Sequence, residues 1–164
     1  MSKITTVLWF NMDGEEAANF YVSLLPDSRI DAVVKAPSDT PSGPEGYTML
    51  IDFTLAGQKY AALNGGPLFT PNESVSFQIV TEDQAETDRL WNAIVGNGGQ
   101  ESACGWCKDK WGYSWQISPR ILLDALVDTD AARKRRIFES MMTMRKIDIA
   151  TIERAAAGET AEAF

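Results

Sequence analysis

A pattern of apolar strand, acidic cap and helix occurs twice in this chain of 164 residues. Asp13 is followed three residues later by Glu16, and the same capping-box spacing returns at Asp83 and Glu86, 70 positions further on. The apolar helix positions coincide at the same offset, as do the strand positions. The pairs are Val7 with Phe77, Trp9 with Ile79, Phe20 with Leu90, Tyr21 with Trp91, Leu24 with Ile94 and Leu25 with Val95. So many coincidences indicate a duplicated structural unit.

Each copy reads as a βαβββ module, at residues 3–66 and 74–119. In the first copy we expect strands at 4–10, 29–35, 47–55 and 58–64, with a helix from Gly14 and a mobile, proline-rich loop at 36–46. The second copy predicts strands at 75–81, around 101–108 and at 113–118, with a helix after Asp83. Gly112 in its last hairpin matches Gly57 in the first, at an offset of 55 because the second copy lacks the long loop. Residues 1–120 are therefore predicted to form one domain.

Residues 121–164 are expected to form a helical extension. We expect a short helix at 121–127, and then a longer one capped by residues 128–130. A third helix at 149–157 is capped by Asp148. The longer helix has an apolar stripe that must be covered by the sheet or by a second subunit, and that stripe comprises Ile137, Phe138, Met141 and Met144. The overall prediction is an α+β fold of two tandem βαβββ modules plus C-terminal helices.

The charge and residue usage exclude several classes of function. The net charge of −8 disfavours nucleic acid and anionic membranes as partners, and no apolar run is long enough to cross a bilayer. On such an acidic chain the basic run at 133–136 is expected to be a solvated helix face. We expect a cytoplasmic protein, since the start of the chain has no signal-peptide pattern and the two cysteines form no disulfide framework. The chain has no histidine, so the commonest general base and metal ligand are both missing.

Several short stretches resemble one protein family. They are Leu8-Trp-Phe10, Glu15-Glu-Ala-Ala-Asn-Phe-Tyr21, Ala62-Leu-Asn-Gly-Gly66, Cys104-Gly-Trp106 and Ser114-Trp-Gln-Ile117. Together with the paired modules they resemble the PhnB-like branch of the vicinal oxygen chelate superfamily, which includes glyoxalases, bleomycin-resistance proteins and extradiol dioxygenases. Members of that branch often carry the label 3-demethylubiquinone-9 3-methyltransferase. The resemblance implies a glyoxalase-like half-barrel cleft, and a cavity completed across a homodimer.

The resemblance also implies four inward positions that hold a metal ion in other members. In this chain they fall on Thr6, Ala61, Ser76 and Gln116. This set contains neither carboxylate nor imidazole, so a divalent ion finds only weak neutral donors. We therefore expect no catalytic metal and no other cofactor.

The cleft positions instead favour a small neutral ligand bound by hydrogen bonds. Alternation places apolar side chains under the helices (Val7, Trp9, Phe77, Ile79, Trp115 and Ile117) and the others on the concave faces. The candidate ligand-binding residues are Thr6, Leu8, Asn64, Ser76, Gln78, Trp106, Ser114 and Gln116. The competing interpretation is a cleft that has lost its function and is filled by water or by the C-terminal tail.

A metal-independent enzyme, such as a lyase, an isomerase or the methyltransferase of the family label, is the alternative to a binding protein. Asp109 and Glu82 are the nearest candidate bases, although surface solvation is the expected role of both. Cys104 and Cys107 have the spacing of a redox pair, but no helix follows them and a strand places them on opposite faces. We interpret them as ordinary strand cysteines.

Overall fold

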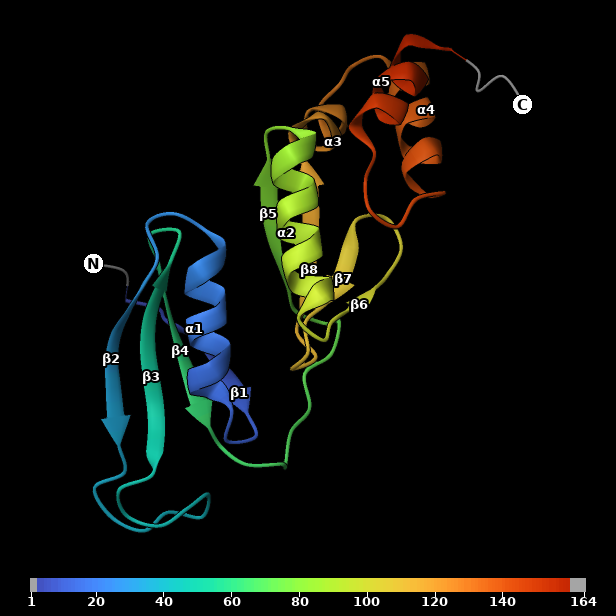
Figure 1. The fold of residues 1–164 in the computed structure, drawn as a ribbon. Coiled ribbons are helices and arrows are strands. Elements are labelled where there is room, and N and C mark those ends of the chain that lie inside the picture. Colours follow the sequence, from blue (N-terminus) through green and yellow to red (C-terminus); the bar gives the residue numbers. More distant parts are fainter. Residues whose placement is uncertain (1–2, 160–164) are drawn as a thin grey trace. The chain divides into compact units, whose positions relative to one another are not determined.

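The structure is a computed structural model that describes residues 3–159, and the chain divides into two compact units, Met1–Pro71 and Asn72–Phe164. The first unit has a four-stranded sheet in the order β1-β4-β3-β2, in which β1 and β4 are parallel and the other pairs antiparallel. One helix lies against this sheet (Figure 1). The elements are β1 (Thr6–Phe10), α1 (Gly14–Leu24), β2 (Arg29–Lys35), β3 (Thr48–Leu55) and β4 (Gln58–Asn64). All were predicted within two residues.

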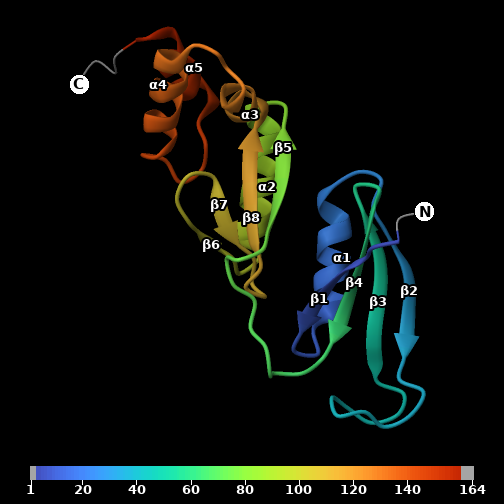
Figure 2. The same ribbon diagram turned by 180° about the vertical axis from the view of Figure 1, so that it is seen from behind.

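The second unit repeats the same topology with the sheet order β5-β8-β7-β6. Its elements are β5 (Ser76–Thr81), α2 (Gln84–Gly96), β6 (Gln100–Glu101), β7 (Trp106–Lys108) and β8 (Ser114–Pro119). Helix α2 covers one face of the sheet, and in Figure 2 the face without the helix is turned toward the viewer. The predicted α+β fold of two βαβββ modules is confirmed.

Three further helices follow β8, as predicted. They are α3 (Arg120–Leu126), α4 (Ala131–Met141) and α5 (Ile149–Ala157). Their buried side chains form an apolar cluster of their own around Ile137, Ile147 and Ile152, each fully buried, with Met141 and Met144 packed against it. The predicted apolar stripe is thus covered in part by the helical extension itself. Within the described residues, no helix combines the length and apolar character needed to cross a bilayer.

The basic run on α4 is engaged in local pairs. Arg133 forms an ion pair with Asp128, and Arg135 with Glu139. Arg136 donates hydrogen bonds of 2.8 Å to the carbonyl oxygens of Ala155 and Ala156, at the C-terminal end of α5. A guanidinium at this end of a helix satisfies carbonyl groups that have no partner within the helix.

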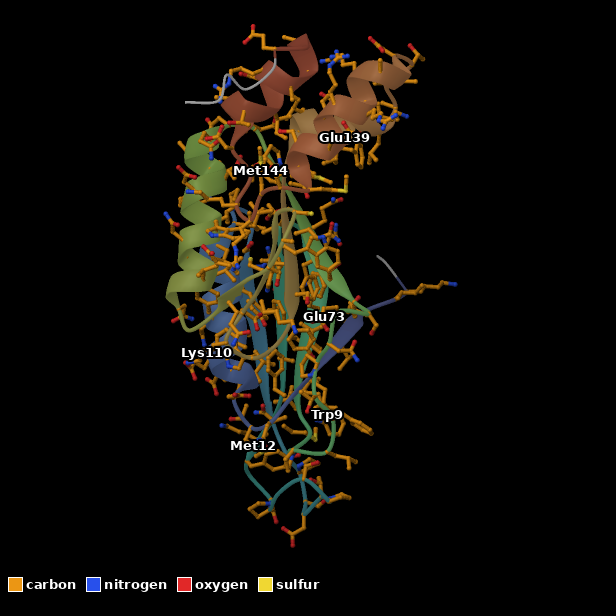
Figure 3. The ribbon with its side chains drawn as sticks, turned by 90° about the vertical axis from the view of Figure 1, so that its right-hand side faces the viewer. Trp9, Met12, Glu73, Lys110, Glu139 and Met144 are labelled. Atoms are coloured by element: carbon orange, nitrogen blue, oxygen red, sulfur yellow. The ribbon has the colours of Figure 1, made fainter. Side chains whose placement is uncertain are left out.

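The faces predicted for β1 are wrong, because the link from strand to helix is one residue longer in the first unit. The ring of Phe10 lies 6.4 Å from that of Tyr21 on α1, and Leu8 is buried, whereas Val7 is 55% exposed. Residues 11–13 join β1 to α1, but only residues 82–83 join β5 to α2. Met12, whose φ is 66°, lies in the longer link and is labelled in Figure 3. A shift of one residue reverses every side chain in a strand, so Val7 and Trp9 point away from α1.

The longer link also changes the cap of α1. Asp83 is extended and its carboxylate accepts a 2.8 Å hydrogen bond from the Glu86 N–H, as the repeat predicts. Asp13 has a different backbone conformation and makes no such bond. The Asn64 side chain replaces it, since its Oδ1 accepts from the Gly14 N–H at 2.9 Å and its Nδ2 donates to the Thr48 carbonyl at 2.8 Å. The prediction of a capping box at Asp13 is therefore wrong.

The predicted strand at 101–108 is interrupted by a turn. Cys104 and Gly105 both have positive φ, 59° and 81°, and they reverse the chain so that β6 and β7 pair as an antiparallel hairpin. The predicted turn that follows β7 is confirmed, since the Gly112 N–H donates to the Asp109 carbonyl at 3.1 Å. Cys104 therefore lies in a turn, whereas Cys107 lies in strand β7.

Candidate functional site

The helix-free face of the second sheet carries a row of uncharged polar side chains. In β5 and β8, Ser76 pairs with Ser114 and Gln78 with Gln116, and Trp106 of β7 lies beside Gln116. Partners in a ladder point to the same face of a sheet. The opposite face is covered by α2, because the hydroxyls of Thr81 and Thr87 lie 2.7 Å apart across it. The alternation predicted for this sheet is confirmed.

Two glutamine–serine pairs fix the polar groups of this face. The Gln116 Nε2 donates to the Ser76 Oγ at 2.8 Å, and the Gln78 Nε2 donates to the Ser118 Oγ at 3.2 Å. An amide has a donor end and an acceptor end. Each glutamine therefore uses its donor end on a neighbouring serine and keeps its carbonyl oxygen as a further acceptor.

A cavity of about 190 Å³ lies over this row. Its polar floor is formed by Gln78, Gln116 and Ser118. Its walls come from the β6–β7 turn and β7, through Cys104 and Trp106, and from apolar side chains of the extension. The latter are Leu122, Leu123, Leu126, Phe138 and Met141. Among the described residues, no charged side chain lines the cavity, and such a lining suits a small neutral molecule with an apolar body.

The structure thus gathers three of the predicted ligand-binding residues, Gln78, Trp106 and Gln116, at one cavity. Ser76 and Ser114 share their face but lie one rung beyond the cavity lining. The Ser114 side chain is 1% exposed, and its Oγ has no hydrogen-bond partner among the described residues.

The candidates in the first sheet lie on the face that packs against α1. Thr6 alternates with Leu8 and pairs with Tyr60, and Leu8 pairs with Ala62, whose Cβ faces the start of α1. Leu8 is 4% exposed and Asn64 only 2%, and the Asn64 amide is occupied by its two backbone bonds. Thr6, Leu8 and Asn64 are therefore left out of the site that we propose.

Sequence reasoning did not identify the part of the site that comes from the extension. Phe138 and Met141 were recognised as an apolar stripe, but nothing in their spacing shows which surface the stripe covers. Strand alternation places Ser118 on the concave face together with Gln116, although Ser118 is not among the candidate ligand-binding residues.

The donor set does not fit a divalent metal ion. The one-residue shift in β1 turns Thr6 toward α1 and puts the Val7 side chain on the other face, with that of Ala61. In the second sheet the corresponding donors are Ser76 and Gln116, which bond each other. These groups are uncharged, and across residues 3–159 no three acidic or cysteine side chains come together in a possible metal site. Hard divalent ions are bound mainly by carboxylates.

The glycine pair after β4 does not fit a nucleotide-containing cofactor such as S-adenosylmethionine. Gly65 and Gly66 both donate their N–H groups to the carbonyl of Phe10, at 3.0 and 3.3 Å. A phosphate- or nucleoside-binding loop needs such groups directed at the ligand, before a helix. In this chain the two N–H groups instead hold the loop against β1.

The two candidate bases have structural partners. Asp109 is 4% exposed, so the predicted surface role is wrong, and its carboxylate accepts hydrogen bonds from the N–H groups of Trp111 and Tyr113 and from the Trp115 indole. Glu82 is exposed and paired with Arg120, whose hydrogen bond holds the pKa of the Glu82 carboxyl below its usual range.

The two cysteines differ in their surroundings. Cys107 is fully buried in β7, and burial, followed by the nearby charges of Asp109 and Glu101, raises the pKa of its thiol to about 12. Cys104 is half-buried and lines the cavity. A buried thiol with a raised pKa is a poor nucleophile, and this supports the interpretation of Cys107 as a structural cysteine.

Iodoacetamide is expected to modify Cys104 in the folded protein at neutral pH and to leave Cys107 intact until unfolding, as measured by mass spectrometry. The raised pKa means that the neutral Cys107 thiol favours the folded state, so stability should fall as pH rises from about 9 to about 12. The Cys107→Ala variant should lack this part of the decline in urea unfolding. Equal alkylation of both thiols in the native protein would contradict the assignment.

Comparison with known proteins identifies a family. The profile of a family described as 3-demethylubiquinone-9 3-methyltransferase matches residues 2–118. Among curated proteins, none matches the chain. The PhnB protein from Bacillus cereus, which carries the same family description, is 31% identical with a TM-score of 0.64. The match covers 72% of this chain and 99% of that one.

A more distant structure agrees in fold. A protein from Pseudomonas aeruginosa is 19% identical with a TM-score of 0.58, and the match covers 73% of this chain and 98% of that one. A glyoxalase-related enzyme from Fulvimarina pelagi is 15% identical with a TM-score of 0.46, over 72% and 88% of the two chains.

Proposed function

The chain belongs to the 3-demethylubiquinone-9 3-methyltransferase family, the PhnB-like branch of the vicinal oxygen chelate superfamily, and we propose that its second module binds a small neutral organic molecule without a metal ion. The observation that carries this proposal is the cavity of about 190 Å³ with an uncharged polar floor and apolar walls. Gln78 and Gln116 each have one amide end to offer a ligand. The indole of Trp106 supplies a flat apolar wall.

A binding protein fits this cavity better than the metal-independent enzyme that the sequence left as an alternative. General acid–base catalysis needs a titratable group within hydrogen-bonding reach of the substrate. Within residues 3–159, no carboxylate, lysine or arginine lines the cavity. Of the described residues that line the cavity, Cys104 is the one with a titratable side chain, and no base among them lies beside it to activate it as a nucleophile. Our proposal is therefore ligand sequestration or sensing.

The homodimer and the cleft shared by both modules stay predictions from the family resemblance. Light scattering at micromolar concentration tests the dimer. The cavity described above lies within the second unit alone, so the binding proposal does not depend on either of them.

Neutral single-ring compounds are expected to raise the melting temperature of the protein, whereas a charged analogue is not. The probes are phenol and 4-methylphenol against benzoate, each measured by thermal shift and by tryptophan fluorescence, with and without Mg²⁺, Mn²⁺ and Zn²⁺. Benzoate should not bind, because an unpaired charge is costly in a cavity that offers it no partner. Metal ions should not strengthen phenol binding.

The Gln116→Leu variant should weaken phenol binding by about threefold to tenfold, the effect of one net hydrogen bond. Gln58→Leu, at an exposed position in β4, is the matched control and should bind as the wild type does. Metal-dependent binding, or stabilisation by S-adenosylmethionine, would contradict the proposal and favour an enzyme.

A further inference from the structure

The three C-terminal helices are an addition to the family fold. The family profile ends at Ser118, and the Bacillus cereus structure is covered over 99% of its own length but over only 72% of this chain. Helix α3 begins at Arg120. These helices therefore lie outside the part of the chain that matches the family, and so does any role that they have in the site.

The extension is fastened to the second module at two places. The N–H groups of Cys104 and Gly105 donate to the carbonyl oxygens of Met144 and Arg145, at 2.8 and 2.7 Å. On α2, the Gln84 side chain donates to the Ile147 carbonyl at 3.0 Å and accepts from the Ile149 N–H at 2.8 Å. Met144, labelled in Figure 3, lies in this connecting segment between α4 and α5. These bonds hold the segment next to the turn that lines the cavity.

The same extension provides the apolar half of the cavity. The side chains from α3 are Leu122, Leu123 and Leu126, and those from α4 are Phe138 and Met141. Phe138 also lines a second hollow of about 390 Å³, together with Lys134 and Arg135. Phe138 is thus shared by the small cavity and by a larger hollow on the surface of α4.

We propose that the extension sets the size of the ligand, with Phe138 and Met141 as the specificity-determining side chains that admit one aromatic ring and exclude two fused rings. This inference rests on the proposed function of the cavity. A dry cavity of about 150 Å³ is known to hold benzene. A cavity of about 190 Å³ therefore has room for a ring with one or two small substituents. Shortening either side chain enlarges the space, and loss of the Phe138 ring joins it to the larger hollow.

The test compares the binding of phenol with that of 1-naphthol, both neutral at pH 7 and both able to bond the glutamine amides. Wild-type protein should bind phenol at least about tenfold more tightly than 1-naphthol, the smaller of the ratios that a hydrophobic pocket gives for one misfitting group. Phe138→Ala and Met141→Ala should reduce or reverse this ratio. Met142→Ala is the matched control, because Met142 follows Met141 in the chain and is 60% exposed. This variant should keep the wild-type ratio of phenol to 1-naphthol binding.

Met141→Trp adds a variant that fills the cavity without removing apolar surface from the core of the extension. It should abolish binding of both compounds while the protein stays folded by circular dichroism. If the wild type binds phenol but all three α4 cavity variants keep its phenol-to-naphthol ratio, the inference is overturned and the proposed function stands. If the wild type binds neither compound while folded, the proposed function and the inference both fail.

Discussion

Asp109→Ala is expected to lower the free energy of unfolding of the second unit by about 3–5 kcal/mol, because three donors lose a charged acceptor in a buried position. The carboxylate accepts from the Trp111 N–H at 2.9 Å, the Tyr113 N–H at 3.0 Å and the Trp115 indole at 2.9 Å. Trp115 is 1% exposed, so the bond from its indole N–H to Asp109 lies in a buried position. Urea unfolding followed by tryptophan fluorescence measures the effect.

Asp109→Asn is the matched control for this effect. An asparagine of the same shape retains one carbonyl oxygen and should recover part of the loss, since it can still accept from the Trp111 and Tyr113 N–H groups. A loss below about 1 kcal/mol for Asp109→Ala would match a single ordinary hydrogen bond, and it would contradict the role of Asp109 as the centre of the β7–β8 hairpin.

The hairpin shows which features the sequence contains and which it does not. The turn at 110–112 was predictable from Gly112, and an aspartate two residues before an N–H is a known way to form a turn. The burial of Asp109 was not predictable, because it depends on the Trp115 indole across the hairpin. A local motif specifies the backbone, but the partner of a side chain comes from the tertiary fold.

The reversed faces of β1 have a similar cause. Residues 7–10 are all apolar, so periodicity cannot decide between Val7 with Trp9 and Leu8 with Phe10 as the buried pair. The repeat favours Val7 and Trp9 as the buried pair, but the extra residue in the 11–13 link shifts the strand against the helix. In β5 and β8 the polar residues alternate with apolar ones, and the faces there were predicted correctly.

The same distinction applies to the candidate site. Gln78 and Gln116 could be predicted because strand alternation places them opposite α2. The contribution of α4 could not, because the sequence of an amphipathic helix gives its apolar side but not the surface on which it packs. The extension covers the polar row and leaves a cavity between the row and the helices, and a cleft without function that is filled by the tail stays the competing interpretation.

Gly105→Ala is expected to destabilise the second unit by about 2–5 kcal/mol, the sum of a left-handed backbone and an overpacked contact. The φ of Gly105 is 81°, and a Cβ there would lie 2.9 Å from the Ile117 carbonyl oxygen and 3.1 Å from the Ile147 Cγ1. The backbone cannot shift easily, because the Gly105 carbonyl accepts from the Ile117 N–H at 2.8 Å. The Gly105 N–H donates to the Arg145 carbonyl oxygen. A backbone shift that relieved the clash would break this bond and release the extension.

Gly46→Ala separates the cost of the left-handed backbone from the cost of the overpacked contact. Gly46 has a φ of 85° with nothing within 4 Å of the added Cβ, so this variant should lose only about 1–2 kcal/mol for the left-handed conformation. Limited proteolysis should cut residues 142–148 of Gly105→Ala faster than those of Gly46→Ala or the wild type. Equal losses of stability in the two variants, with equal protection of that segment, would show that Gly105 does not join the extension to the sheet. A larger loss of stability in Gly105→Ala than in Gly46→Ala, together with weakened phenol binding in Gly105→Ala, is expected if the extension must be held in place to complete the cavity.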